Sequence, residues 1–257
     1  MNDPIYDLLA NTPYMSPAQA KRMMQFISDH EITAILELGF AHGVSTCYMA
    51  TALARSSGGS VVTIDLEGAR TLTPNIEELL GRVGERDRVE VFFEPTSYTW
   101  RLMKLLEEDG SPRFDLCYLD GAHTWFVDGF AFFLVDRLLK PGGWIIFDDV
   151  NWTYDDSPTL RSSDQVRHMP AEERTTPQVK KIYELLVKAH PSYEEFLLDG
   201  DWAFARKKLG SGPPGAQREI VVEQVVRLEQ VHVGTGAVLA RFARALRGRM
   251  TRKRRSL

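Results

Sequence analysis

The sequence predicts an α/β fold built on a doubly wound, mostly parallel β-sheet. Between residues 32 and 149, five short apolar runs alternate with segments whose apolar residues recur at helical spacing. Strands that are apolar along nearly their whole length are typical of a parallel sheet with helices on both faces. Further along, two apolar segments flank Asp199-Gly200. Because Asp-Gly favours a tight hairpin turn, we expect the sheet to end in an antiparallel pair.

Each expected element rests on a local signal. A helix should begin at Pro17, because Ser16 can act as its N-cap and proline suits the first helical position. The buried strands are expected at residues 32–40, 60–67, 88–95, 114–121 and 144–149. Helices are expected at residues 43–56, 75–84, 98–110, 125–143 (with its closing turn) and 178–190, before the hairpin at 193–208. This order of elements predicts a Rossmann-like sheet.

The composition is that of an ordinary globular protein. The 257 residues are 44% hydrophobic and 26% charged, with a net charge of −4. No apolar run approaches the roughly 20 residues of a membrane span. The first residues show no signal-peptide pattern, and Cys47 and Cys117 lie in apolar segments. We therefore expect a cytoplasmic protein without disulfides.

Charge and linker composition predict three parts in the chain. They are an N-terminal helical cap at 1–30, a ligand-binding domain at 31–208, and a linker with an amphipathic basic helical tail at 209–257. From Arg241 onward there are eight Lys or Arg residues and no acid, so the first 240 residues carry about −12. Such a body does not favour nucleic acid. Contact of the tail with a membrane surface, a partner helix for it, and plain disorder all stay open, as does a homo-oligomer.

A glycine-containing turn follows the first strand. Gly39 allows a tight turn, and Gly43 lets the backbone approach a ligand at the start of the next helix. The turn lacks the G-x-G-x-x-G spacing of dinucleotide sites, and Glu37 would repel a pyrophosphate. It suits a cationic or hydroxyl-bearing ligand, unless Glu37 is a chance surface residue. Asp65 ends the second strand, where an acid often binds ribose.

Three aspartates follow two other strands. Asp120 ends the strand at 114–121, and Asp148 and Asp149 end the strand at 144–149. If these strands are neighbours, the carboxylates converge and repel each other unless a cation or ligand intervenes. Carboxylate oxygens suit Mg²⁺ or another hard divalent cation. The other interpretation is that Asp120 touches only a cofactor while Asp148 and Asp149 are turn and cap residues.

Four phrases in this order, LELGFAHGVST, VVTIDLE, DLCYLDGAHTW and LKPGGWIIFDDVNW, resemble class I S-adenosylmethionine-dependent methyltransferases. Within that class they resemble the metal-dependent small-molecule O-methyltransferases, both catechol-type and bacterial sugar or antibiotic enzymes. The resemblance covers roughly residues 30–207. It implies S-adenosylmethionine and Mg²⁺ as cofactors. The family places a glycine or an acid where Pro95 and Thr96 stand here. The cofactor residues that it implies are Glu37, Gly39, Phe40, Gly43, Ser45, Thr46, Asp65, Leu66, Thr96, Ser97 and Asp120.

The resemblance also implies a general base. Methyl transfer to oxygen needs a deprotonated hydroxyl, and an imidazole suits proton removal near neutral pH. His123 stands three residues after Asp120, where related enzymes often place the base. Its other interpretation is a solvent-exposed histidine at a helix start. The polar segment 153–177 leaves the strand that bears Asp148 and Asp149, so we expect it to act as a lid.

These observations favour a Mg²⁺-dependent O-methyltransferase that acts on a hydroxyl of a small molecule, with a sugar or glycosylated metabolite preferred over a catechol. A nicotinamide-dependent oxidoreductase is the second enzymatic interpretation, which the missing glycine spacing disfavours. A third is a methyltransferase-like binding or scaffold protein that works through its basic tail.

Overall fold

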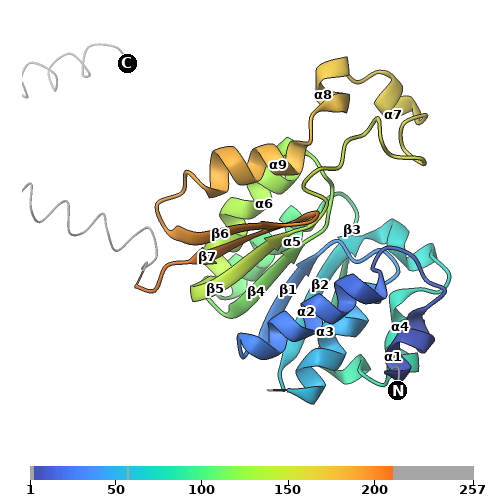
Figure 1. Ribbon diagram of the computed structural model, residues 1–257, viewed down its shortest axis with the longest axis vertical. Coiled ribbons are helices and arrows are strands. Elements are labelled where there is room, and N and C mark those ends of the chain that lie inside the picture. The colour runs from blue at the N-terminus through green and yellow to red at the C-terminus, as the bar shows by residue number, and fades with distance from the viewer. Residues whose placement is uncertain (1–2, 57, 211–257) are drawn as a thin grey trace, which may run out of the picture. The chain divides into compact units, whose positions relative to one another are not determined.

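A seven-stranded sheet runs through the computed structural model, which describes residues 3–56 and 58–210 (Figure 1). Its strands lie in the order β3-β2-β1-β4-β5-β7-β6. The strands are β1 (Ala34–Leu38), β2 (Ser60–Leu66), β3 (Val89–Glu94), β4 (Phe114–Leu119), β5 (Leu139–Phe147), β6 (Tyr193–Asp199) and β7 (Trp202–Lys207).

The first five strands are parallel, and β7 runs antiparallel between β5 and β6. The predicted Rossmann-like sheet with a C-terminal hairpin is therefore confirmed. The hairpin turns at Asp199–Trp202, as the Asp-Gly pair indicated. The predicted tail lies outside the described residues from 211 onward.

Helices cover both faces of the sheet. Figure 1 shows α2 and α3 on one face and α5, α6 and α9 on the other, and the two hydrophobic cores follow this division. The helices are α1 (Pro4–Leu9), α2 (Pro17–Asp29), α3 (Val44–Arg55), α4 (Ile76–Val83), α5 (Tyr98–Glu108), α6 (Trp125–Leu138), α7 (Asp164–Arg167), α8 (Ala171–Thr175) and α9 (Gln178–Ile182).

The central strands feed both cores alternately. In β4, Leu116 and Tyr118 belong to the core under α2, α3 and α4, whereas Cys117 and Leu119 belong to the core under α5 and α6. Successive side chains of a strand point to opposite faces, so a strand that is buried on both sides must be apolar throughout. This explains why the strands read as continuous apolar runs.

The N-terminal segment joins the first of these cores. Ser16 caps α2 as predicted, with a capping box in which Gln19 bonds back to the Ser16 amide. Met23 and Ile27 of α2 are fully buried in the same cluster as the sheet residues Ile35 and Ile146. Residues 3–30 therefore pack as part of the sheet's own core.

The region after β5 carries the least regular structure. Within 153–177 the chain forms only the short helices α7 and α8. The helix predicted at 178–190 begins as α9 and then widens into a π-helical turn at Tyr183–Val187. Within the residues that the structure describes, no helix is long and apolar enough to cross a membrane.

The shared core predicts that α2 unfolds together with the sheet. Replacing fully buried Met23 with alanine should lower the free energy of unfolding by about 2–5 kcal/mol through the cavity it leaves. Denaturant unfolding followed by far-UV circular dichroism and by tryptophan fluorescence should show one coincident transition. The neighbouring Met24→Ala, at a partly exposed position, should cost less. Two separated transitions would contradict a common core.

Candidate active site

The carboxyl ends of β1, β2, β4 and β5 meet around one cavity of about 480 Å³. The strand order reverses direction between β1 and β4, which is where open α/β sheets bind ligands. Most of the sequence-predicted site residues line this cavity, namely Gly39, Phe40, Ser45, Asp65, Leu66, Thr96, Ser97, Asp120, His123, Asp148 and Asp149. Glu37, Gly43 and Thr46 are not among its lining residues. A larger open groove of about 680 Å³, lined by α2, β6 and β7, contains none of them.

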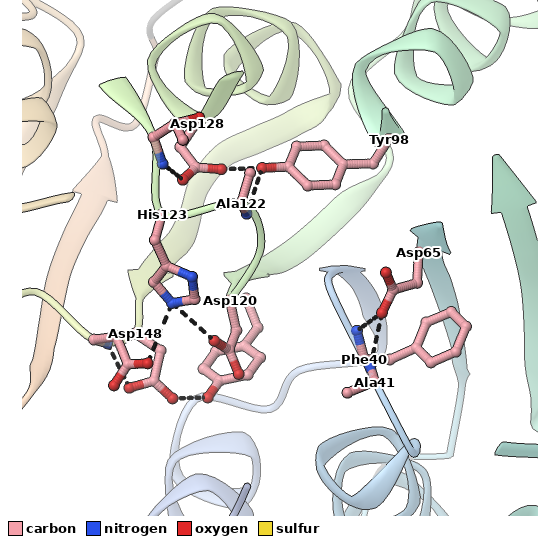
Figure 2. Close-up of polar contacts among 12 residues, drawn as sticks. Phe40, Ala41, Asp65, Tyr98, Asp120, Ala122, His123, Asp128 and Asp148 are labelled. Carbon is pink, nitrogen blue, oxygen red and sulfur yellow. Dashed lines mark hydrogen bonds and ion pairs between the residues drawn. The ribbon is translucent and has the colours of Figure 1, made fainter. Parts of the chain in front are cut away.

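The turn after β1 is fixed by backbone contacts on two sides. The Asp65 carboxylate accepts the amide hydrogens of Phe40 and Ala41 at 2.9 and 2.7 Å (Figure 2). Gly39 has φ +87°, and a Cβ at this position would lie 2.0 Å from the carbonyl oxygen of Asp120. Only glycine fits this contact, which places the turn directly against the loop that carries Asp120 and His123.

Glu37 lies beneath this turn, where no solvent reaches it. Its carboxylate accepts hydrogen bonds from the hydroxyls of Ser45, Thr46 and Thr63 at 2.5, 2.5 and 2.6 Å. Burial raises the pKa of Glu37 to about 7, although the three donated hydrogen bonds oppose the rise. Glu37 is thus a buried bracket between β1, β2 and α3. The interpretation of it as a chance surface residue is wrong.

Asp120, His123 and Asp149 form a compact cluster at the other end of the cavity. Each residue offers one atom that could coordinate a metal, a carboxylate oxygen or a ring nitrogen, and these three atoms lie within 4.8 Å of one another. His123 Nε2 is 3.2 Å from Asp149 Oδ2 and 3.6 Å from Asp120 Oδ1. His123 and Asp149 both adopt left-handed backbone conformations, with φ +57° and +54°. Such strained residues persist where the surrounding structure holds them, and they concentrate at functional sites.

Asp148 is held slightly apart from this cluster. The hydroxyl of buried Tyr118 donates to Asp148 Oδ2, and the Asp149 amide donates to Oδ1 at 2.7 Å. Burial, together with the nearby charge of Asp120, raises the pKa of Asp148 to about 7. Asp148 therefore lines the cavity beside Asp120 and Asp149, while His123 takes a place in the compact group.

The charge of His123 follows from its neighbours. Burial disfavours its protonated form, but the carboxylates of Asp120 and Asp149 outweigh this and raise the pKa of His123 to about 10. The imidazole thus carries a proton at neutral pH and forms a charged cluster with the two acids. Trp152 lies against it, with ring centroids 4.9 Å apart.

The cluster fits a divalent cation. Its two carboxylates come from the ends of neighbouring strands and are ligands that a hard divalent cation takes, and His123 lies beside them. His123 Nε2 is buried without a well-formed hydrogen bond, although two acids flank it at ion-pair distance. A buried polar atom in this state needs an explanation, and a catalytic role or a bound ion beside it supplies one.

Sequence reasoning missed two residues that support His123. Tyr98 and Asp128 are buried side chains that hydrogen-bond each other and the backbone around His123 (Figure 2). The available signal was the acid of Asp128 within the mostly apolar first two turns of the helix WFVDGFAFFLVDRL. A charged residue in such a run is rarely buried unless it is paired.

Other aromatic and polar residues that flank these motifs divide between the cavity and the surface. Trp152 and Tyr14 line the cavity, and Tyr14 stacks on His42 at 5.8 Å. Trp125 is 41% exposed at the start of α6 and does not line the cavity. His168 ends α7, where its ring bonds the Asp164 carbonyl.

The chain is similar in sequence to a known protein family and to one curated relative. Residues 36–150 match a family model described as a methyltransferase domain. The catechol O-methyltransferase of Niastella koreensis is 29% identical over 136 residues, which are 53% of this chain and 58% of that relative. The chain thus spans little more than half the length of the curated relative it matches.

Solved structures share the fold. An O-methyltransferase from Bacillus cereus, in complex with S-adenosylhomocysteine, is 24% identical with a TM-score of 0.58, covering 81% of this chain and 92% of that one. An O-methyltransferase of tomaymycin synthesis from Streptomyces achromogenes, in complex with S-adenosylmethionine, is 18% identical with a TM-score of 0.57, covering 81% and 91%.

The contact between Gly39 and Asp120 predicts a severe effect of one methyl group. Gly39→Ala should destabilise the protein by about 3–5 kcal/mol and abolish ligand binding in the cavity, because it combines a left-handed backbone with a steric clash. Gly58→Ala is the matched control, since Gly58 has φ +74° and open space around it. It should cost only about 1–2 kcal/mol. If Gly39→Ala and Gly58→Ala lost equal stability, measured by thermal and denaturant unfolding, the role of the close approach would be refuted.

The buried Glu37 predicts a pH-dependent stability. Its folded pKa of about 7 lies above its ordinary value of 4.5, so the folded state holds the proton more tightly than the unfolded state. This contribution is fully present below pH 4.5 and is lost as the pH rises through 7, a change of roughly 3 kcal/mol. The free energy of unfolding of Glu37→Gln, measured from pH 5 to 8, should lack this component. Glu108→Gln, a change at an exposed position, should keep the wild-type dependence of the free energy of unfolding on pH.

Proposed function

We propose that the chain is an S-adenosylmethionine-dependent methyltransferase, since residues 36–150 match a methyltransferase-domain family model, and that it methylates a hydroxyl of a small molecule with the help of a divalent cation. The observation that carries this proposal is one cavity with two differently equipped ends. One end has the glycine turn and Asp65, and the other has the acid–histidine cluster.

The first end suits the methyl donor. Gly39 and Phe40 bring the backbone to the cavity wall, and Asp65 stands beside them with a carboxylate that suits ribose hydroxyls. Thr96 and Ser97 line the same cavity before α5 and are proposed to border the adenine. Glu37, Gly43 and Thr46 would support this end from below, since they shape the turn without lining the cavity. S-adenosylmethionine supplies a methyl group on a positively charged sulfur.

The second end suits the cation and the substrate. Asp120 and Asp149 would hold Mg²⁺ or a similar ion, with Asp148 beside them and Tyr118 fixing its carboxylate. Such an ion lowers the pKa of the substrate hydroxyl and orients it. Trp152 lines this end of the cavity and lies against the ring of His123.

His123 is proposed as the general base, although at neutral pH its imidazole is protonated by its two acidic neighbours. It can accept a proton from the substrate only once those carboxylates are engaged by a cation instead of by the imidazolium. His123 and the ion therefore depend on the same pair of acids.

The proposed substrate is a small molecule with two neighbouring oxygens, and we prefer a sugar or glycosylated metabolite. A flat aromatic wall such as Trp152, with the hydroxyls of Ser157 and Thr159 on the cavity lining, suits a sugar ring. A catechol, the substrate in the name of the Niastella relative, has the same pair of oxygens and is the rival.

Calorimetry tests the proposal directly. S-adenosylhomocysteine should bind wild-type protein with a micromolar Kd, and Mg²⁺ or Mn²⁺ should then give a second binding signal. Asp120→Asn should lose the metal signal, because it removes a charge from the cluster. Asp164→Asn, whose side chain is 94% exposed on α7, should keep both.

Activity assays with methyl glycosides and with catechol, each with and without EDTA, separate the substrate classes. Methylation that persists in EDTA would contradict the metal mechanism. If S-adenosylhomocysteine does not bind at all, the proposed activity as a whole is refuted.

A further inference from the structure

We propose that Tyr98 and Asp128 form a positioning pair that sets the geometry of His123 and couples the cofactor end of the cavity to the metal end. This inference rests on the proposed function, since it concerns the same cavity. Neither residue is among the proposed ligands of the cation. Both act on His123 through the backbone that carries it.

Tyr98 contacts the loop after β4 at two points. Its hydroxyl accepts the Ala122 amide at 3.2 Å and donates to Asp128 Oδ1. Its ring packs against Gly121 so closely that a Cβ there would lie 2.5 Å from the ring edge. Tyr98 therefore fixes the position of the loop immediately before His123.

Asp128 holds the other side of the same loop. It is fully buried in the first turn of α6, and its Oδ2 accepts the Thr124 amide at 3.0 Å. The amides before and after His123 thus both donate to the Tyr98–Asp128 pair, as Figure 2 shows. Pinning both flanking amides is what keeps His123 in its left-handed conformation at φ +57°, with the ring directed at Asp120.

The same tyrosine also touches the cofactor end. Tyr98 is the first residue of α5, directly after Thr96 and Ser97, and all three line the cavity. A ligand that orders the 96–97 turn would also fix the position of the Tyr98 hydroxyl. We therefore expect cofactor binding to tighten metal binding, and by linkage the reverse.

The pair is sensitive to small changes because it is buried. Removing the Tyr98 hydroxyl leaves the Ala122 amide and Asp128 Oδ1 without their partner in a low-dielectric interior. The loop then gains freedom next to the metal cluster. Supporting residues of this kind typically change metal affinity or activity by about 10–100-fold.

The test uses Mn²⁺ as the probe in the full-length protein, with affinity measured by electron paramagnetic resonance with and without S-adenosylhomocysteine. Tyr98→Phe should weaken Mn²⁺ binding by about 10-fold or more and abolish the tightening by S-adenosylhomocysteine. Asp128→Asn, which keeps an acceptor for the Thr124 amide, should show a smaller loss. In turnover at saturating metal, Tyr98→Phe should lower kcat, and because the coupling is reciprocal it should also raise the KM for S-adenosylmethionine.

Tyr183→Phe is the matched control. Tyr183 is also fully buried, but its hydroxyl donates to the Phe204 carbonyl at 2.8 Å, within the β7 backbone. It should lose comparable stability while keeping Mn²⁺ affinity and kcat. If Tyr98→Phe binds Mn²⁺ within twofold of wild type, or if Tyr183→Phe weakens it equally, the positioning role is overturned. Wild-type protein that binds S-adenosylhomocysteine but no Mn²⁺ would overturn the metal mechanism and this inference together.

Discussion

The close contact between the Gly39 backbone and the Asp120 carbonyl is the constraint on which the rest of the site depends. It occurs where β1 and β4 lie side by side, at the point where the strand order reverses. A side chain on Gly39 would force these loops apart. With glycine there, the turn braced by Asp65 and the loop that carries His123 share one wall of a single cavity.

Buried acids organise this cavity from below and from the sides. Glu37 brackets the turn through three hydroxyl donors, Asp148 is fixed by Tyr118, and Asp128 is fixed by Tyr98. Each buried carboxylate is costly by itself and is stabilised by the donors around it. The acids that reach the cavity more openly, Asp120 and Asp149, are those left to interact with His123 and a ligand.

The sequence anticipated most of the fold for a simple reason. A doubly buried parallel strand must be apolar on both faces, and helices must cover it, so the pattern of apolar runs predicts the sheet. The hairpin at Asp199-Gly200 followed from turn chemistry. The sequence also placed Asp65, Asp120, Asp148 and Asp149 near one edge, because parallel strands share their carboxyl ends. Their cofactor and metal roles, and that of His123, stay predictions.

What the sequence by itself determined is therefore the topology and the residues that gather at one sheet edge, since both follow from periodicity and strand direction. The tertiary structure decided which of them face the cavity. Glu37 sits in a strand whose alternate side chains point into a core, so it is buried under Ser45 and Thr46. The left-handed backbone of His123 directs its ring toward Asp120 and Asp149. A long-range hydrogen bond from Tyr118 holds the Asp148 carboxylate away from that ring. Such contacts join residues about 30 positions apart, and no local pattern in a single sequence encodes them.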